Sequence, residues 1–160
     1  MPQTSQAILV VDDEADIRDA YPLMLRKEIQ AGAYRFVFAC DGEQALALLD
    51  RHPDISVALL DINMPGMDGL TFLGRVCQQA YIDQPYQFLK VIMVTAYGDM
   101  PNLRKALNFG AFDFIVKPFE VADIRATLNK ALHETGKLRE LYQRYKLEEQ
   151  RRLNAEHQLG

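Results

Sequence analysis

Five short apolar segments, separated by stretches with helical spacing, limit the folds that this chain can adopt. They contain the runs AILVV, FVFA, SVALL, KVIMV and DFIV, which are rich in β-branched residues or phenylalanine and lack polar alternation. Such runs are typical of parallel strands that are buried on both faces of a sheet. Their alternation with helical segments predicts an α/β fold in which right-handed crossovers join parallel strands.

Five helices are expected between and after these strands. The first runs from about Ala15 to Lys27, the second follows Asp41-Gly42, the third follows Asp68-Gly69, the fourth ends at Asn108-Phe109-Gly110, and the fifth begins near Val121. Aspartate before a helix accepts hydrogen bonds from its first N–H groups, and glycine after a helix permits the turn that ends it. The polar connection from Gln78 to Phe88 makes the end of the third helix the least defined boundary.

Four of the five predicted strands end in a chemically capable side chain. These residues are Asp12 with Asp13, Asp61, Thr95 and Lys117. Because the carboxyl ends of parallel strands lie along one edge of a sheet, we expect these side chains to converge on one pocket. Each alone has an ordinary structural explanation, such as a turn or a helix cap. Their combination favours a functional site.

The expected pocket has the chemistry of phosphoryl transfer. Three carboxylates repel one another unless a cation neutralises them, and Mg²⁺ suits a site with few carboxylates and room for phosphate oxygens. Asp61 can act as a nucleophile toward phosphorus, because a carboxylate needs no deprotonating base at neutral pH. Lys117 offsets charge on the transferring group, and the hydroxyl of Thr95 can hydrogen-bond its oxygens.

Four motifs, ILVVDDE, LLDINMPGMDGL, VIMVTAYGD and DFIVKPF, occur in the order seen in one known family. Over about residues 6–135, the chain closely resembles the receiver domain of two-component response regulators, the chemotaxis-regulator-like family. The resemblance implies a flavodoxin-like, doubly wound sheet of five parallel strands in the order 2-1-3-4-5, flanked by five helices.

The resemblance also implies roles for the residues at the strand ends. Asp61 is expected to be the phosphoacceptor, and Asp12 and Asp13 to be the acid pair that holds Mg²⁺ together with Asp61. Asn63 stands where the family supplies a backbone carbonyl to the metal ion. Lys117 is expected to pair with the acceptor or with the phosphoryl group.

Further positions resemble the switch and tuning residues of the family. Thr95 is expected to move toward the phosphoryl oxygen on activation, while the ring of Phe114 changes position by packing alone, because it has no hydroxyl. The family commonly has a cis peptide bond before the proline that matches Pro118. Three positions are expected to tune the site: Asn63, Ala96 and Tyr97.

Residues 1–135 are expected to form the receiver domain, and residues 136–160 a helical or coiled-coil linker toward an effector domain outside this chain. The linker is rich in residues that favour helices. Gly136 marks either a break between two helices or only a weak point in one helix, since glycine costs on the order of 1 kcal/mol there.

The linker has an imperfect heptad pattern. Leu138, Leu141 and Tyr145 fall at spacings of three and four, and Glu148 and Arg152 interrupt the same register. Two hypotheses remain open for it: a solvated helix that frays, or a signalling helix that pairs in a parallel dimer. The homodimer could instead form through the face of the fourth helix, fifth strand and fifth helix.

The preferred interpretation is a receiver that takes a phosphoryl group from a sensor histidine kinase or phosphotransfer protein and then controls an effector. It is not an enzyme with an independent substrate, because it catalyses only its own phosphorylation and dephosphorylation. One alternative is a Mg²⁺-dependent phosphatase, although VVDDEAD lacks the second acid at the spacing of those enzymes. Another is an interaction module that works without phosphorylation.

Composition limits the remaining possibilities. The net charge is -4 and the excess of basic residues is confined to the tail, so no direct binding of nucleic acid is expected. No apolar stretch approaches the roughly 20 residues of a membrane span, and the first residues lack a signal core, so we expect a cytoplasmic protein. Cys40 and Cys77 match no metal or redox spacing and are expected to be buried.

Overall fold

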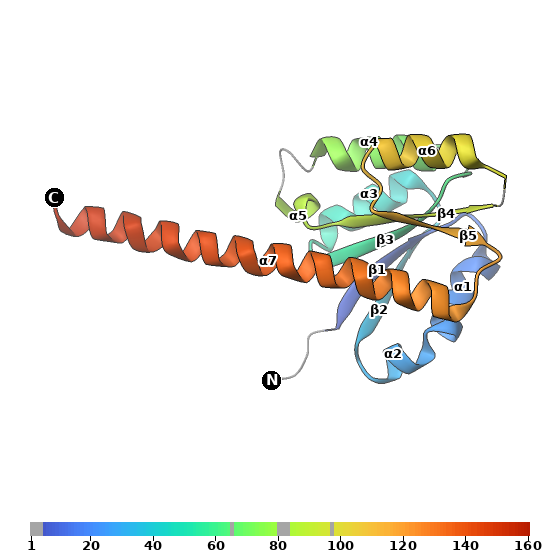
Figure 1. The fold of residues 1–160 in the computed structure, drawn as a ribbon, viewed down its shortest axis with the longest axis horizontal. Coiled ribbons are helices and arrows are strands. Elements are labelled where there is room, and N and C mark those ends of the chain that lie inside the picture. Colours follow the sequence, from blue (N-terminus) through green and yellow to red (C-terminus); the bar gives the residue numbers. More distant parts are fainter. Residues whose placement is uncertain (1–4, 65, 80–83, 97) are drawn as a thin grey trace.

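A computed structural model of the chain describes residues 5–64, 66–79, 84–96 and 98–160, which form a parallel sheet between two layers of helices (Figure 1). The strands are β1 (Gln6–Val11), β2 (Tyr34–Ala39), β3 (Ile55–Asp61), β4 (Lys90–Ala96) and β5 (Asp113–Lys117). Their order in the sheet is β2-β1-β3-β4-β5, and every neighbouring pair is parallel. The predicted fold class and strand order are confirmed.

The part of the chain that the structure describes contains seven helices. They are α1 (Ala15–Met24), α2 (Arg26–Gln30), α3 (Gly42–Arg51), α4 (Gly69–Gln79), α5 (Gln84–Gln87), α6 (Met100–Asn108) and α7 (Val121–Gln158). The five expected helical segments are present. The count differs because the first segment is divided at Leu25, which leaves helical geometry, and because the short α5 forms within the polar connection. Pro22 also weakens this segment, since it lacks the N–H that would bond to the preceding turn.

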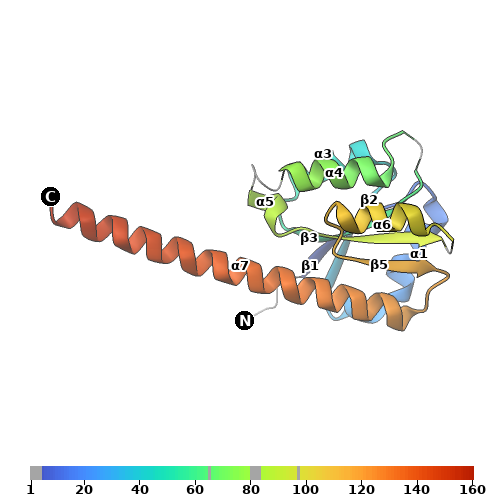
Figure 2. The same ribbon diagram turned by 45° about the horizontal axis from the view of Figure 1, so that its top comes forward.

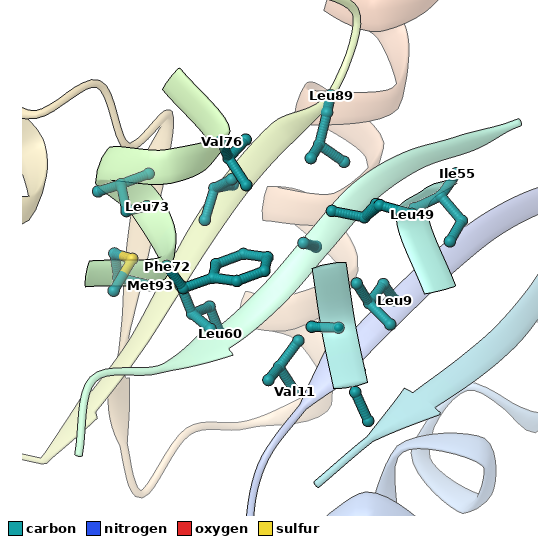
Figure 3. Close-up of a cluster of buried hydrophobic side chains, with 14 of the residues drawn as sticks. Leu9, Val11, Leu49, Ile55, Leu60, Phe72, Leu73, Val76, Leu89 and Met93 are labelled. Atoms are coloured by element: carbon teal, nitrogen blue, oxygen red, sulfur yellow. The ribbon is translucent and has the colours of Figure 1, made fainter. Parts of the chain in front are cut away.

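Both faces of the sheet are buried. Helices α3, α4 and α6 cover one face, and α1, α2 and α7 cover the other (Figures 1 and 2). Leu9 of β1 and Leu60 of β3 pack with Phe72 of α4 in the first core (Figure 3). Ile8 of β1 faces the second core with Leu128 of α7. Burial on both sides explains why these strands show no polar alternation.

The two cysteines depart from expectation. Cys40 is exposed just beyond β2, and Cys77 in α4 is half-buried with its Sγ donating to the carbonyl of Phe109 at 2.9 Å. The prediction that both are buried is therefore wrong. Cys40 lies beyond an edge strand, where no further strand covers it.

Helix α7 continues well past the body of the domain (Figure 1). Its 38 residues form one helix through Gly136, so this glycine is not a break. The buried hydroxyl of Thr135 donates to the carbonyl of Phe88 at 2.8 Å, and the ring of Phe88 meets Tyr142 edge to face at 5.5 Å. The guanidinium of Arg139 also lies over the Phe88 ring. These contacts attach the base of the projecting helix to the segment before β4.

Among the described residues, no helix is both long enough and apolar enough to cross a bilayer.

The attachment of α7 through Thr135 can be tested with Thr135→Val. This change leaves the partly buried Phe88 carbonyl without its hydroxyl donor, so the free energy of unfolding in urea should fall by about 1–3 kcal/mol. Thr127→Val is the matched control in the same helix, at a partly exposed position, and should change stability by less than about 0.5 kcal/mol. Equal effects of the two changes would contradict the role given to the hydrogen bond.

Candidate functional site

The carboxyl ends of four strands bring the predicted side chains to one edge of the sheet. Asp12 follows β1, Asp61 ends β3, Thr95 lies near the end of β4, and Lys117 ends β5. One carboxylate oxygen from each of Asp12, Asp13 and Asp61 lies within 4.8 Å of the others. Residues separated by about a hundred positions in the sequence therefore meet, as the parallel topology predicts.

Lys117 lies between two of the three carboxylates. Its Nζ is 3.7 Å from Oδ2 of Asp12 and 3.8 Å from Oδ2 of Asp61. The side chain of Asp12 is 3% exposed and that of Asp61 13%, so both carboxylates are largely removed from water. One ammonium group faces three carboxylates, which leaves the cluster with an excess of negative charge.

Opposing effects act on the pKa of the Asp61 carboxyl, and together they raise it. Burial raises the pKa of its carboxyl above the ordinary value, while the Lys117 ammonium and the backbone N–H of Asn63 lower it. That N–H donates to Oδ1 of Asp61 at 3.2 Å. The negative charges of Asp12 and Asp13 raise the pKa of Asp61 further.

Asp12 has a structural role as well as a place in the cluster. Its Oδ1 accepts the backbone N–H of Glu14 at 2.9 Å, which stabilises the turn before α1, and Arg18 donates to its backbone carbonyl at 2.7 Å. A role in the turn before α1 therefore accounts for one of its two carboxylate oxygens. The other oxygen, Oδ2, faces Lys117.

The acidic cluster fits a hard divalent cation. Carboxylate oxygens are the ligands that Mg²⁺ prefers, and three of them gather here beside the ammonium group of Lys117. Asp13 is exposed, which leaves one side of the cluster open to water. Mg²⁺ typically keeps several waters when it binds to proteins.

The loop after β3 is held close to Asp61 by Gly69. The N–H of Gly69 donates to the carbonyl of Ile62 at 3.1 Å, and a Cβ at this position would lie 2.5 Å from the carbonyl oxygen of Asp61. Asp68 caps α4 by accepting the N–H of Thr71 at 2.8 Å. The Asp61 backbone can therefore occupy this position only because Gly69 has no side chain.

The remaining predicted residues surround this centre. Thr95 is buried with its Oγ1 3.4 Å from the carbonyl oxygen of Ala96, and Ala96 is exposed at the end of β4. The ring of Phe114 on β5 is 38% exposed. The peptide bond between Lys117 and Pro118 is cis, as expected. The tuning position Tyr97 lies outside the described residues.

Two residues near the site were not singled out from the sequence. Tyr21 of α1 is buried and stacks on Phe119 at 6.2 Å, and burial together with the charges of Asp12 and Asp61 raises the pKa of its hydroxyl. The second residue is Asp99, which lies inside the motif VIMVTAYGD. Its position in the sequence does not by itself indicate a role in the site.

Asp99 links two loops at the edge of the site. Its Oδ2 accepts the side-chain amide of Asn63 at 3.2 Å, and its Oδ1 accepts that of Asn102 at 2.9 Å. The segment after β3 is therefore tied to the start of α6. Sequence reasoning missed this contact because it joins residues 36 positions apart through side chains alone.

Comparison with known proteins decides the family. The family model described as "Response regulator receiver domain" matches residues 8–129. The chain belongs to the response regulator receiver domain family. It is thus the phosphoacceptor module of a two-component response regulator, and proteins of this kind interact with kinases and with output domains.

Relatives and solved structures agree with this membership. The receiver is 38% identical over 136 residues to a probable transcriptional regulator, ycf27, of Guillardia theta, covering 84% of this chain and 48% of the relative. It is 33% identical to sporulation initiation phosphotransferase F of Bacillus subtilis, covering 80% of this chain and 94% of that protein. The structure of chemotaxis protein CheY4 of Vibrio cholerae matches with a TM-score of 0.68 and 28% identity, covering 79% and 98%. The receiver therefore spans about half the length of the first of these relatives.

Gly69→Ala tests whether the glycine contact positions Asp61. The added Cβ would overlap the Asp61 carbonyl, so the loop must shift, and the free energy of unfolding should fall by about 1–3 kcal/mol. Gly74→Ala in the same helix meets nothing within 4 Å and should stabilise the receiver by roughly 0.5–1 kcal/mol. Urea unfolding measures both values. A stabilising Gly69→Ala would contradict the proposed close packing.

Proposed function

We propose that Asp61 is the phosphoacceptor of this receiver. The observation that carries the proposal is the position of its carboxylate, which lies between the Lys117 ammonium and the carboxylates of Asp12 and Asp13 at the end of a buried strand. Among these three carboxylates, only Asp61 lies at the end of the central strand β3. Asp12 is committed through Oδ1 to the turn before α1, and Asp13 is exposed.

In the proposed reaction, an oxygen of Asp61 attacks the phosphorus of a phosphohistidine. The new O–P bond forms while the P–N bond of the donor breaks, and the electron pair leaves with the imidazole nitrogen. Lys117 offsets negative charge on the transferring group, since its Nζ already lies within 4 Å of Asp61. A bound Mg²⁺ would be held by Asp12, Asp13, Asp61 and the backbone carbonyl of Asn63, and would neutralise phosphoryl oxygens.

Thr95 and Phe114 are proposed to relay the phosphorylation state. Thr95 lies near the end of β4, where a short movement of its hydroxyl away from the Ala96 carbonyl can bring it to a phosphoryl oxygen. Phe114 is the neighbour of Met93 on the adjacent strand, two residues before Thr95. Its half-exposed ring can repack when Thr95 moves.

Asn63, Ala96 and Tyr97 are proposed to tune the lifetime of the aspartyl phosphate. The hydrogen bond from the Asn63 amide to Asp99 supports this role for Asn63, because it restrains a side chain two positions beyond Asp61. The small, exposed side chain of Ala96 leaves space beside the phosphoryl group.

The partners and the extent of catalysis are also proposed. The phosphodonor is a sensor histidine kinase or phosphotransfer protein, the output lies on or beyond α7, and the receiver turns over no independent substrate. A boundary between receiver and linker near residue 135 is supported by the last buried position of α7, Thr135. The cytoplasmic location and the lack of direct nucleic acid binding stay predictions.

Asp61→Asn should abolish labelling by acetyl phosphate in the presence of Mg²⁺, because an amide is a poor nucleophile toward phosphorus. Intact-protein mass spectrometry should show one phosphoryl adduct on the unchanged chain and none on the variant. The adduct should also require Mg²⁺. Asp54→Asn, at the opposite end of β3 with an exposed side chain, is the matched control and should be labelled normally.

Full labelling of Asp61→Asn would refute the assignment of the phosphoacceptor. No adduct on the unchanged chain under any condition would favour an interaction module that works without phosphorylation. Continuous release of phosphate from many monoesters would instead favour a phosphatase.

A further inference from the structure

The projecting part of α7 carries a row of side chains that repeats every three or four residues. We call this row the α7 seam, and it consists of Leu138, Leu141, Tyr145, Glu148, Arg152, Ala155 and Leu159, the last of which is the C-cap that directly follows the end of α7 at Gln158. Leu141 is 65% exposed, Tyr145 60% and Leu159 89%, although large apolar side chains of the receiver body are mostly buried. A repeat of this period, on one face of a long helix, is the pattern that packs against a second helix.

The surface is hollowed along the seam. A groove of about 590 Å³ is lined on the side of the body by Gln87 and Phe88 and on the side of α7 mainly by seam residues, from Leu138 to Glu148. A smaller hollow continues along the helix to Arg152 and shares Tyr145 and Glu148 with the first. The hollowed strip is therefore open and elongated, which fits a helix better than a small molecule.

The two charged residues of the seam discriminate between orientations of a second copy of this chain. In a parallel, in-register pair, Glu148 faces Glu148 of the second copy and Arg152 faces Arg152. In an antiparallel pair centred on residue 150, Glu148 faces Arg152 of the second copy, and the same contact occurs twice. Opposite charges attract and like charges repel across a packed interface, so the seam favours the antiparallel pair.

Side-chain size points the same way. In the antiparallel pair, Tyr145 faces Ala155 of the second copy, so a large residue meets a small one. Leu141 faces Leu159. In the parallel pair, two tyrosines meet in one layer and two alanines in another, which leaves one layer crowded and one underfilled.

Charges beside the seam favour the parallel pair, but less strongly. In the parallel pair, Arg144 would face Glu149 of the second copy and Arg151 would face its Glu156. In the antiparallel pair, Glu149 would face Glu149 of the second copy and Arg151 would face its Arg151, so like charges would meet. These side chains lie at the exposed edge, where an ion pair contributes only about 0–1 kcal/mol. Arg144 also already pairs with Glu140 of its own chain at 2.8 Å. The residues at the centre of the interface lose more water and therefore decide the orientation.

We propose that two copies of this chain associate through antiparallel pairing of their α7 seams. Leu159 of each helix then lies beside Leu141 of the other, at the end of the groove next to Phe88. This orientation differs from the parallel dimer considered from the sequence. It places the two receivers at opposite ends of the helix pair, and it does not depend on the phosphorylation of Asp61.

Distance measurements on the full chain test the orientation directly. Spin labels are attached to Lys137→Cys in a background of Cys40→Ser and Cys77→Ala. A rise of 1.5 Å per residue predicts a separation of about 40 Å in the antiparallel dimer, whereas labels on adjacent parallel helices lie roughly 10–20 Å apart. A label at Gln150→Cys gives a short distance in either orientation and reports that the dimer is present.

A long distance at position 137 together with a short one at position 150 supports the proposal. Short distances at both positions overturn it in favour of a parallel pair. A monomer in light scattering at concentrations up to about 0.5 mM, with no dipolar signal, also overturns it. Circular dichroism verifies that each labelled variant keeps its helix content.

Charge exchange provides an independent test. Glu148→Arg or Arg152→Glu alone should raise the dimer dissociation constant by about tenfold or more, since each creates two layers of like charges. The double variant restores opposite charges and should return to within about threefold of the unchanged chain. Glu140→Arg, outside the seam, is the control and should have little effect. Single variants as tight as the unchanged chain, or a double variant as weak as the singles, overturn the proposal.

Acetyl phosphate labelling of the same samples separates this proposal from the proposed function. Full labelling of a chain that does not dimerise overturns the antiparallel pairing and leaves the phosphoacceptor assignment intact. An antiparallel dimer that acetyl phosphate does not label leaves the antiparallel pairing intact and refutes the phosphoacceptor assignment.

Discussion

The site depends on the repulsion between carboxylates that the sheet brings together. Asp12 and Asp61 stand at the ends of adjacent strands, and the ammonium group of Lys117 lies within 4 Å of both. Burial of the strands leaves these groups little freedom to move apart. The energy of the packed core therefore maintains an electrostatic arrangement that the isolated side chains would avoid, and this arrangement is suited to binding a cation and a phosphoryl group.

The fold could be predicted well from the sequence because its strongest signal is also its main physical constraint. Strands buried on both faces must be continuously apolar, so AILVV and SVALL are recognisable without any neighbour. The polar residues that follow them, such as Asp12 and Asp61, mark the edge where burial ends. The same reasoning placed the acidic cluster, because parallel topology brings these edges together.

Features that depend on contacts between distant side chains could not be predicted. The link between Asn63 and Asp99 and the burial of Tyr21 within the electrostatic reach of Asp12 and Asp61 depend on the packing of loops and helices after the sheet has formed. The continuity of α7 through Gly136 belongs to the same class. Glycine weakens a helix locally, but Thr135 and its partner Phe88 hold the adjoining turn against the body. The spacing of residues in the sequence does not indicate these contacts.

The attachment of α7 has a mechanical consequence. The helix begins four residues after Lys117, so its start is close to the chemistry, and its first half is packed against the sheet. Beyond Tyr142 it extends for roughly 25 Å as a rigid rod, at 1.5 Å per residue. A tilt of about 5° at the base would displace the far end of this free part by about 2 Å. The helix is therefore a lever: a small rotation next to Phe88, where it leaves the body, becomes a larger displacement at its far end.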